Sequence, residues 1–356
     1  MLDLGRSFLA SVARDPHALA IVDGDVRLTY AEWYARISGV VAHFDALGLQ
    51  PGDHVLTVLT NRYEAATLHW ACQLAGLIIT PLNFRAKPDE IDHAVEDAEI
   101  RAIYFEDAWR EAVKGSEKAR AVPALSVDDA AFKAVLASEA PKAAARVGAD
   151  AWSVMLYTSG TTSRPKGVPR RHRAERAAVI AHVSQNVYGH GERTLGVMPL
   201  YHTMGVRSLL AMSVIGGAFV CLPRFAPEAA LGLIAQDKIT NLYLVPTLYH
   251  DLVHHPAFAE ADASSVRKLG FAGASMTDGL LKRLDAAFQP DLFVNHFGSS
   301  EIYTFTVDQN AVAKPGSAGR AGINQIIRVV KLGATGPDDL AGPGEEGEII
   351  ALLAGD

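Results

Sequence analysis

Short apolar runs alternate with stretches of helical periodicity along most of this chain of 356 residues. In the first third, apolar runs at 54–59 and 77–81 flank a helical stretch between Asn61 and Ala75. Neighbouring parallel strands need a crossover of this kind, so the order predicts βαβ units and a parallel sheet. The pattern resumes at Trp152, with strands expected at 152–157, 194–198, 218–222, 240–245, 268–271 and 292–297. The alternation therefore predicts an α/β fold.

Changes in texture along the chain predict three units. Residues 1–150 and 151–313 are expected to form two α/β subdomains, the second of which holds the ligand sites. Residues 314–356 are rich in Gly turns and are expected to begin a small β subdomain, with strands at 326–331 and 348–353.

Capping signals predict where helices begin. Thr29 and Glu32 have capping-box spacing, so a helix is expected from there towards Leu47. Asn61 and Thr277 are expected to cap two further helices.

Composition narrows the class of protein. With 49% hydrophobic and 21% charged residues the chain is typical of soluble globular proteins. A net charge of −7 argues against a nucleic-acid binder. Cys72 and Cys221 lack the spacing of a disulfide framework, and the apolar stretch 209–222 is too short to span a bilayer. No signal-peptide layout is visible, so we expect a cytoplasmic protein without nucleic-acid or membrane partners.

A loop after the strand expected at 152–157 combines hydroxyls, glycines and a lysine. It reads Tyr-Thr-Ser-Gly-Thr-Thr-Ser-Arg-Pro-Lys-Gly over residues 157–167. Hydroxyl and backbone N–H groups donate to phosphate oxygens, and a lysine offsets their charge. The Walker A pattern does not fit, because Pro165 has no N–H to donate and Gly167 stands where that pattern needs Ser or Thr. The loop therefore predicts a phosphate site of another kind.

Three later segments also follow expected strands. They are Met-Pro-Leu-Tyr-His at 198–202, Phe-Ala-Gly-Ala-Ser-Met at 271–276 and Asn-His-Phe-Gly-Ser-Ser-Glu at 295–301. In open α/β sheets ligands bind outside the carboxyl ends of the strands, so these segments are expected to meet at one site.

The loop at 157–167 resembles the signature of the acyl-adenylate-forming superfamily, which includes acyl-CoA synthetases, luciferases and peptide-synthetase adenylation domains. Ser163 stands where glycine is common in that signature. The three later segments, and turns at 316–320 and 344–349, resemble that family's motifs in the same order. The resemblance runs from Leu28 to Ile349 and is nearest to bacterial aryl-CoA ligases of the benzoate, halobenzoate and anthranilate type. It implies the family's large N-terminal domain.

This resemblance implies two half-reactions. A carboxylate attacks the α-phosphate of ATP to give acyl-AMP and pyrophosphate, and the thiol of coenzyme A then takes the acyl group. The catalytic residues would be Lys166, His202 and Glu301, with Glu301 and Thr161 at Mg²⁺. Phe297 would pack on adenine or ribose, with Phe in place of the family's usual Tyr.

The resemblance also assigns the two binding sites. The ATP and phosphate site would comprise Thr158, Ser159, Gly160, Thr161, Thr162, Lys166, Gly273, Ala274, Ser275, Asn295, His296, Phe297, Gly298, Ser299 and Ser300. The acyl pocket would comprise His202, Thr203, Met204, Tyr243, Gly273, His296, Gly298 and Tyr303. Such a compact, aromatic pocket with polar tips suits a small aromatic acid, amino- or hydroxy-substituted among others.

The chain departs from the family at its end. Asp356 comes too soon after Ile349 to be assigned as the family's ribose-binding Asp. That residue, the hinge and the mobile C-terminal domain with its catalytic lysine would therefore lie outside this chain. We expect the chain alone to bind ATP and the acid but to adenylate slowly.

Several alternatives stay open. The chain could load a carrier protein in place of coenzyme A, or it could be a catalytically silent module that binds an acyl-adenylate or a carboxylate. A homodimer is also compatible with the resemblance. His250 and His254 have the i, i+4 spacing of a metal site without an evident third ligand, so a solvated helix face is the favoured interpretation. The basic run 170–173 could contact a phosphate of coenzyme A or simply face solvent.

Overall fold

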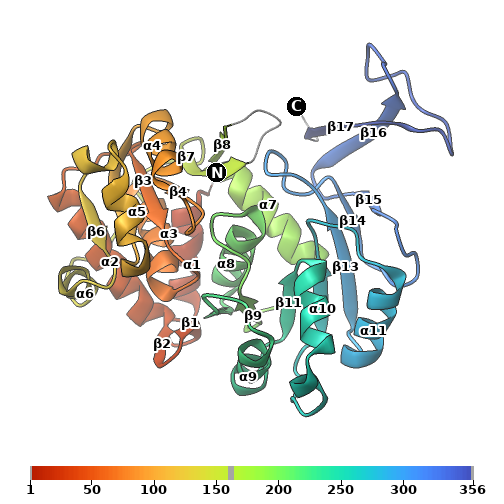
Figure 1. Cartoon of the computed structure of the whole chain (residues 1–356), viewed down its shortest axis with the longest axis horizontal. Coiled ribbons are helices and arrows are strands. Elements are labelled where there is room, and N and C mark those ends of the chain that lie inside the picture. Colours follow the sequence, from red (N-terminus) through yellow and green to blue (C-terminus); the bar gives the residue numbers. More distant parts are fainter. Residues whose placement is uncertain (1, 159–163, 354–356) are drawn as a thin grey trace.

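The computed structural model of the chain describes residues 2–158 and 164–353 (Figure 1). Two large sheets stand side by side, and a β-ribbon projects from the later half of the chain. This is the mixed α/β architecture that the sequence predicted.

The first sheet has six strands within the described residues, in the order β6-β5-β3-β4-β7-β8. Its strands are β3 (His54–Val58), β4 (Ile78–Pro81), β5 (Ile100–Phe105), β6 (Ala124–Ser126), β7 (Trp152–Thr158) and β8 (Lys166–Arg171). All are parallel except β8, which pairs antiparallel with β7.

The second sheet has nine strands in the described part of the chain, in the order β15-β14-β13-β12-β11-β9-β10-β1-β2. Its strands are β1 (Leu19–Asp23), β2 (Val26–Thr29), β9 (Arg193–Gly196), β10 (Ala218–Cys221), β11 (Asn241–Leu244), β12 (Lys268–Phe271), β13 (Leu292–Phe297), β14 (Thr306–Asp308) and β15 (Arg320–Ala321). The run from β13 to β1 is parallel. The strands β2, β14 and β15 pair antiparallel.

Helices fill the space between the two sheets and cover both outer faces. The α-helices are α1 (Leu4–Arg14), α2 (Tyr30–Ala46), α3 (Tyr63–Ala75), α4 (Pro88–Asp97), α5 (Arg110–Gly115), α6 (Ala130–Leu136), α7 (His172–Gln185), α8 (Thr203–Ile215), α9 (Pro227–Asp237), α10 (Pro246–His254) and α11 (Asp278–Phe288). Short 3₁₀ turns lie at η1 (Asp107–Trp109), η2 (Ala119–Ala121) and η3 (Pro256–Ala259). The central core contains residues of α1, α2, α3, α7 and α8, whereas α4 and α5 cover the first sheet and α9 to α11 the second.

Successive residues of a strand point to opposite faces, and both faces are buried here. In β3, Val55 belongs to the central core and Leu56 to the outer core of the first sheet. In β10, Phe219 and Val220 divide in the same way between the central core and the outer core of the second sheet. Burial on both faces explains why these strands read as continuous apolar runs.

The last described strands, β16 (Gln325–Lys331) and β17 (Gly347–Leu353), form an antiparallel ribbon. The ribbon projects beyond the second sheet (Figure 1). These strands match the two expected near the end of the chain, at 326–331 and 348–353.

Local predictions held better than long-range ones. Thr29 caps α2 in a capping box with Glu32, and Thr277 caps α11, as predicted. The prediction that Asn61 caps α3 is wrong, because Arg62 occupies the N-cap and the Asn61 side chain bonds elsewhere. The expected boundary at 150/151 falls between strands of one sheet, since β7 and β8 join the first sheet while β1 and β2 belong to the second.

Candidate functional site

Four adjacent parallel strands deliver the predicted segments to one edge of the second sheet. The strands β9, β11, β12 and β13 are neighbours, and their carboxyl ends lead into residues 197–202, Val245, 272–276 and 298–303. Because the strands are parallel, these ends lie at the same edge. The three later segments singled out in the sequence are therefore brought together by the order of the second sheet.

The predicted phosphate loop connects two antiparallel strands. Thr158, the last residue of β7, pairs with Lys166, the first of β8, and Lys166 is exposed. The predicted contacts Ser159, Gly160, Thr161 and Thr162 lie outside the described residues. A Walker A loop leads from a strand into a helix, whereas this loop leads into a strand. The structure therefore agrees with the sequence analysis, which excluded the Walker A pattern.

Helix α4 braces the hairpin of β7 and β8 at the end next to its loop. The Tyr157 hydroxyl bonds the Asp97 carboxylate at 2.7 Å, and His93 Nε2 lies 2.9 Å from the Pro165 carbonyl oxygen. Since a carbonyl oxygen can only accept, His93 Nε2 carries the proton. The hairpin forms one edge of the first sheet and lies at the top of the view (Figure 1).

Arg170 of β8 links this hairpin to the end of β13. Its side chain is buried and forms a 3.0 Å ion pair with the buried Glu175 of α7. It also donates to the backbone carbonyl of Ser300. The Tyr303 hydroxyl completes the group with a 2.6 Å bond to Glu175. The phosphate hairpin and the loop after β13 thus share one buried ionic group.

Asn61 holds the segment that carries His202. Its side-chain amide donates to the carbonyls of Gly196 at 2.9 Å and Met198 at 2.6 Å, and its oxygen accepts from the Leu200 N–H at 3.1 Å. Asn61 is buried, so these bonds are not shared with solvent. The residue therefore positions the segment before His202 from a loop of the first sheet.

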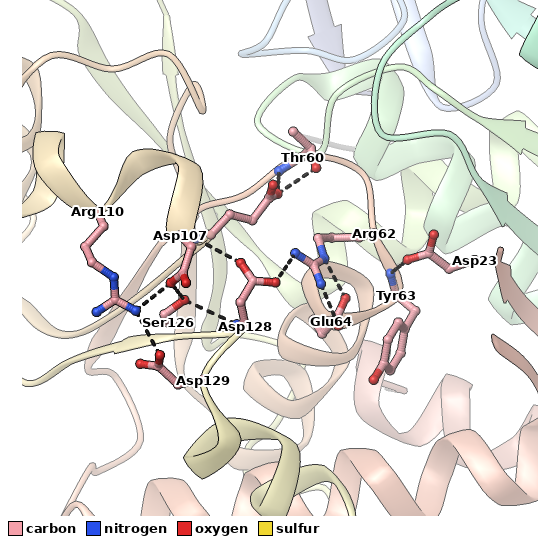
Figure 2. A network of polar contacts seen from close by, with 11 residues as sticks. Asp23, Thr60, Arg62, Tyr63, Glu64, Asp107, Arg110, Ser126, Asp128 and Asp129 are labelled. Atoms are coloured by element: carbon pink, nitrogen blue, oxygen red, sulfur yellow. Dashed lines mark hydrogen bonds and ion pairs between the residues drawn. The ribbon is translucent and has the colours of Figure 1, made fainter. Parts of the chain in front are cut away.

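The loop that carries Asn61 is itself fixed by a polar network (Figure 2). Thr60 Oγ1 donates to Glu106 at 2.6 Å. Arg62 bonds both oxygens of Glu64, at 2.8 and 2.9 Å, and reaches Asp128 at 2.8 Å. The network ties the end of β3 to the loops that follow β5 and β6.

His202 starts helix α8 at the mouth of the site. Its Nδ1 accepts from the Met204 N–H at 3.2 Å, so a neutral ring carries its proton on Nε2. Desolvation lowers the pKa of His202 below its usual value, which favours this neutral form. Thr203 Oγ1 lies 3.4 Å from Ser300 Oγ, so the His202 segment and the loop after β13 meet here.

Two predicted glycines stand where a side chain would not fit. Gly273 has φ +85°, a backbone conformation that favours glycine, and a Cβ there would lie 3.3 Å from Val245 Cγ1. A Cβ on Gly298 would lie 1.8 Å from the Tyr303 carbonyl oxygen. Both glycines, with Ala274, Ser275 and Phe297, are exposed and form the outer edge of the site.

Two residues of the predicted acyl pocket, Tyr243 and His296, belong to a buried aromatic cluster, called the floor below. Tyr243 of β11 and His296 of β13 have ring centroids 5.3 Å apart, and His182 of α7 lies 4.8 Å from Tyr243 and 5.1 Å from His296. All three are buried. Burial, with the nearby charge of Arg207, lowers the pKa of His296 to about 3, so the ring is neutral at pH 7.

The floor also contains Arg207 of α8, which sequence reasoning missed. The Arg207 and Arg170 guanidinium carbons lie 3.3 and 3.4 Å from the Tyr303 ring centroid. One ring face can hold only one planar group at such a distance, so the two cations stack on opposite faces of Tyr303. Burial lowers the pKa of Arg207, whose side chain is only 3% exposed.

The predicted metal ligand Glu301 is exposed at the outer edge. Among residues 2–158 and 164–353, no group of three or more His, Cys, Asp or Glu side chains could hold a metal ion. One carboxylate at an open edge still fits Mg²⁺ that takes its other ligands from substrate phosphates and water. At His250 and His254 the rings stack with centroids 4.2 Å apart, and the His254 Nδ1 lies 2.8 Å from the His250 carbonyl. The favoured interpretation of an exposed helix face therefore agrees with the structure.

The basic run 170–173 is not a free cationic patch. Arg170 is buried, Arg171 stacks on Trp152 at 4.1 Å, and Arg173 pairs with Asp150 at 3.1 Å. His172 accepts the Leu4 N–H at 3.3 Å. These side chains brace the start of α7, and Arg173 is exposed, as the solvent interpretation expected. A contact with a phosphate of coenzyme A stays a prediction.

Comparisons with known proteins agree with this geometry. A family model described as AMP-binding enzyme matches residues 8–352. The chain belongs to this family of AMP-binding enzymes, which places it among the AMP-forming acid–thiol ligases and confirms the resemblance seen in the sequence. Enzymes of this family use ATP and coenzyme A.

Two curated relatives are ligases of this kind. A feruloyl-CoA synthase of Amycolatopsis sp is 31% identical over 341 residues, which is 94% of this chain and 67% of the relative. A 4-chlorobenzoate–CoA ligase of Pseudomonas sp. (strain CBS-3) is 30% identical over 339 residues, 91% of this chain and 62% of the relative. This chain therefore spans about two thirds of the length of these proteins.

Solved structures share the fold. The N-terminal domain of FACL13 from Mycobacterium tuberculosis matches with a TM-score of 0.89 at 24% identity, covering 99% of this chain and 90% of that one. ATP-bound MatB from Rhodopseudomonas palustris matches with a TM-score of 0.86 at 26% identity, covering 99% of this chain and 70% of that one. In the described part of this chain, no helix is long and apolar enough to cross a membrane.

Proposed function

We propose that this chain activates a small aromatic carboxylic acid with ATP, as the N-terminal domain of an aryl-CoA ligase. The observation that carries the proposal is the meeting of β9, β11, β12 and β13 at one edge, joined to the phosphate hairpin through Arg170. In this arrangement the nucleotide would bind at the exposed edge, beside the aromatic floor where the acid would bind. The names of the two relatives, feruloyl-CoA synthase and 4-chlorobenzoate–CoA ligase, favour an aromatic acid.

In the first half-reaction an oxygen of the substrate carboxylate attacks the α-phosphorus of ATP. A new P–O bond forms, the bond to the β-phosphate oxygen breaks, and pyrophosphate leaves. Lys166 would offset charge on the phosphates, and the hydroxyls of Ser299 and Ser300 would donate to the α-phosphate. Mg²⁺ held by Glu301 would offset further phosphate charge. The other predicted nucleotide contacts, including Asn295 and Phe297, keep their proposed roles.

In the second half-reaction a thiol attacks the acyl carbon, a thioester forms and AMP leaves. His202, with its proton on Nε2, stands where it could donate a hydrogen bond to the acid. We propose coenzyme A as the acceptor because both relatives are named as CoA-dependent enzymes. Transfer to a carrier protein is the second candidate, and a silent binding module is the third.

The domain organisation, the localisation and the oligomeric state of the protein belong to the same proposal. The chain would function as two α/β subdomains and the start of a β subdomain, with a C-terminal domain supplied from outside residues 1–356. We also propose that the protein acts in the cytoplasm, and a homodimer stays a prediction.

ATP–pyrophosphate exchange tests the activation step. The full chain would be assayed with benzoate, substituted benzoates, short aliphatic acids and long-chain acids. We expect exchange with small aromatic acids, and we expect Lys166→Ala and Glu301→Ala to lower its rate strongly. Thioester formation with coenzyme A or with a carrier protein would then identify the acceptor. Exchange with none of the acids, or exchange untouched by both substitutions, would contradict the proposal.

A further inference from the structure

The floor of the site contains buried polar atoms that have no hydrogen-bond partner among the described residues. They are Arg207 Nη1 and Nη2, His182 Nε2 and His296 Nδ1. All three side chains are at least nine-tenths buried. Leaving buried donors and acceptors unpaired is costly, so a group of this size calls for a partner.

Asn186 fixes the protonation of both histidines. Its Nδ2 donates to the His182 backbone carbonyl at 2.8 Å, which settles the orientation of the amide. The same Nδ2 lies 3.2 Å from His182 Nδ1, so that ring nitrogen accepts and the unpaired Nε2 carries the proton. Asn186 Oδ1 lies 3.1 Å from His296 Nε2, so His296 Nε2 donates and its unpaired Nδ1 is an acceptor.

The unpaired atoms are therefore mostly donors, and they lie close together. Arg207 offers two N–H groups and His182 offers one, against the single acceptor of His296. The rings of His182 and His296 have centroids 5.1 Å apart, and helices α7 and α8, which carry His182 and Arg207, pack against each other. After burial, the charge of Arg207 is also among the causes that lower the pKa values of His182 and His296. Arg207 stacks on Tyr303 through its flat face, which leaves the N–H groups in its plane free to donate.

The charges of this region do not cancel. Arg170 and Glu175 neutralise each other in a buried ion pair, and both histidines are neutral at pH 7. Arg207 retains its positive charge without an ion-pair partner among the described residues. A buried cation of this kind is stabilised by an electron-rich group that accepts hydrogen bonds in its plane.

The depth of Arg207 separates it from the reacting end of the acid. Lys166, Glu301 and Phe297 are exposed at the outer edge, where the phosphates are proposed to bind. Arg207, His182 and His296 are buried, Arg207 against Tyr303 and the two histidines against Tyr243. An acid whose carboxylate reaches the phosphates would point its opposite end at these side chains.

We infer that Arg207 and His182 form a subsite for an oxygen substituent, hydroxyl or carboxylate, at the end of the aromatic acid opposite its reacting carboxyl. The inference rests on the proposed function and names the class of acid within it. The substituent oxygen accepts from the Arg207 guanidinium and from His182 Nε2. A hydroxyl would in addition donate to His296 Nδ1, whereas a carboxylate would neutralise the charge of Arg207.

ATP–pyrophosphate exchange with matched acids tests this subsite. The acids are benzoate, 3- and 4-hydroxybenzoate, and benzene-1,3- and benzene-1,4-dicarboxylate. We expect at least one oxygen-substituted acid to exceed benzoate in kcat/KM by about 10- to 100-fold, because a site built to bond an oxygen discriminates against an acid that lacks it. The hydroxy and dicarboxylic arms identify which oxygen group is preferred.

Variants of Arg207 identify the side chain responsible. In Arg207→Met, kcat/KM for the substituted acid should lie within about threefold of kcat/KM for benzoate. The loss should come chiefly from a higher KM for the substituted acid. Arg207→Lys, which keeps the charge, should retain part of it. Arg27→Met, a partly exposed arginine paired with Asp237 on the far side of the second sheet, is the matched control and should keep the full preference.

Three results would overturn the subsite. If Arg207→Met lowered exchange equally for all five acids, the side chain would bind the reacting carboxylate. If benzoate equalled every substituted acid, or if a folded Arg207→Lys and a folded Arg207→Met both kept the preference, Arg207 would not bind the substituent. Calorimetry measures the binding of each acid to the folded variants directly, which gives the same comparison without turnover. Absence of exchange with every acid would instead count against the proposed function.

Discussion

The outer edge and the buried floor of this site are built in opposite ways. The edge carries the residues of the sequence motifs, such as Lys166, Glu301 and Phe297, and they are exposed. The floor carries Arg170, Glu175 and Arg207, which come from β8, α7 and α8 and are buried in contact with Tyr303. Under the proposed function, the edge is a surface where a nucleotide would supply hydrogen-bond and ionic partners. The floor has polar groups of its own, which under the proposed function the acid would have to match.

Removing Arg170, a buried cation of the floor, should have the largest effect on stability. Arg170→Met leaves Glu175 without its ion-pair partner, so we expect the free energy of unfolding to fall by about 3–5 kcal/mol. Urea denaturation measures the change. The matched control is Arg173→Met, whose ion pair with Asp150 is exposed and should contribute at most about 1 kcal/mol. Equal losses in the two variants would mean that burial does not distinguish them.

Removing a cation from the edge should act on turnover and leave stability unchanged. Lys166→Ala is expected to lower the rate of ATP–pyrophosphate exchange by about 10²–10³-fold, because it removes charge stabilisation at the phosphates. The side chain is exposed, so the urea midpoint should not move. Lys282→Ala, on the exposed face of α11, is the control for both readouts. A large loss of stability in Lys166→Ala would blur the distinction between edge and floor.

Asn61 joins the two regions, so its loss should affect both readouts moderately. Asn61→Ala leaves the carbonyls of Gly196 and Met198 unpaired, at a cost of about 1–3 kcal/mol in the free energy of unfolding. The displaced His202 segment should also raise KM for the acid. Asn83→Ala, at an exposed position, provides the comparison. An unchanged KM in a destabilised Asn61→Ala would show that this brace does not set the geometry of the acyl site.

The floor should also make stability depend on pH. Burial lowers the pKa of His296 to about 3, whereas the unfolded chain titrates its histidines near pH 6.5. The unfolded state therefore binds more protons below pH 6.5, and stability falls as the pH falls from there towards 3. His296 alone should cost about 1.4 kcal/mol at pH 5.5 relative to pH 8.

Urea denaturation between pH 8 and 5.5 measures this slope. His296→Gln should reduce it, and His254→Gln, on an exposed helix face, should leave it unchanged. A slope unaffected by His296→Gln would contradict a neutral, buried floor.

The sequence predicted the parts of the fold that depend on local pattern. Strands β12 and β13 lie at the expected residues, because burial on both faces gives a continuous apolar run. Sheet membership could not be predicted in the same way. Strand β1 pairs with β10, nearly 200 residues later, and nothing local in either strand specifies that partner.

The same limit applies to the site. His202, Gly273 and Glu301 could be named because each stands in a motif after a strand. Arg207 could not, because it lies within the apolar run of α8, where an arginine reads as a surface residue. The only feature of the sequence that could have indicated a role for Arg207 was its position among apolar residues. A charged side chain in a buried helix needs a polar partner. Asn61 was misread as a helix cap because its partners are more than 130 residues away.

The division between edge and floor is tested most directly by measuring the binding of each ligand separately. Calorimetry on the folded chain would compare Mg²⁺–ATP with the preferred acid in Glu301→Ala and in Arg207→Met. The account predicts a crossed result: Glu301→Ala weakens ATP binding and spares the acid, and Arg207→Met weakens the acid and spares ATP. If both substitutions weakened the same ligand, or if neither changed either affinity, the two regions would not have the separate roles described for them.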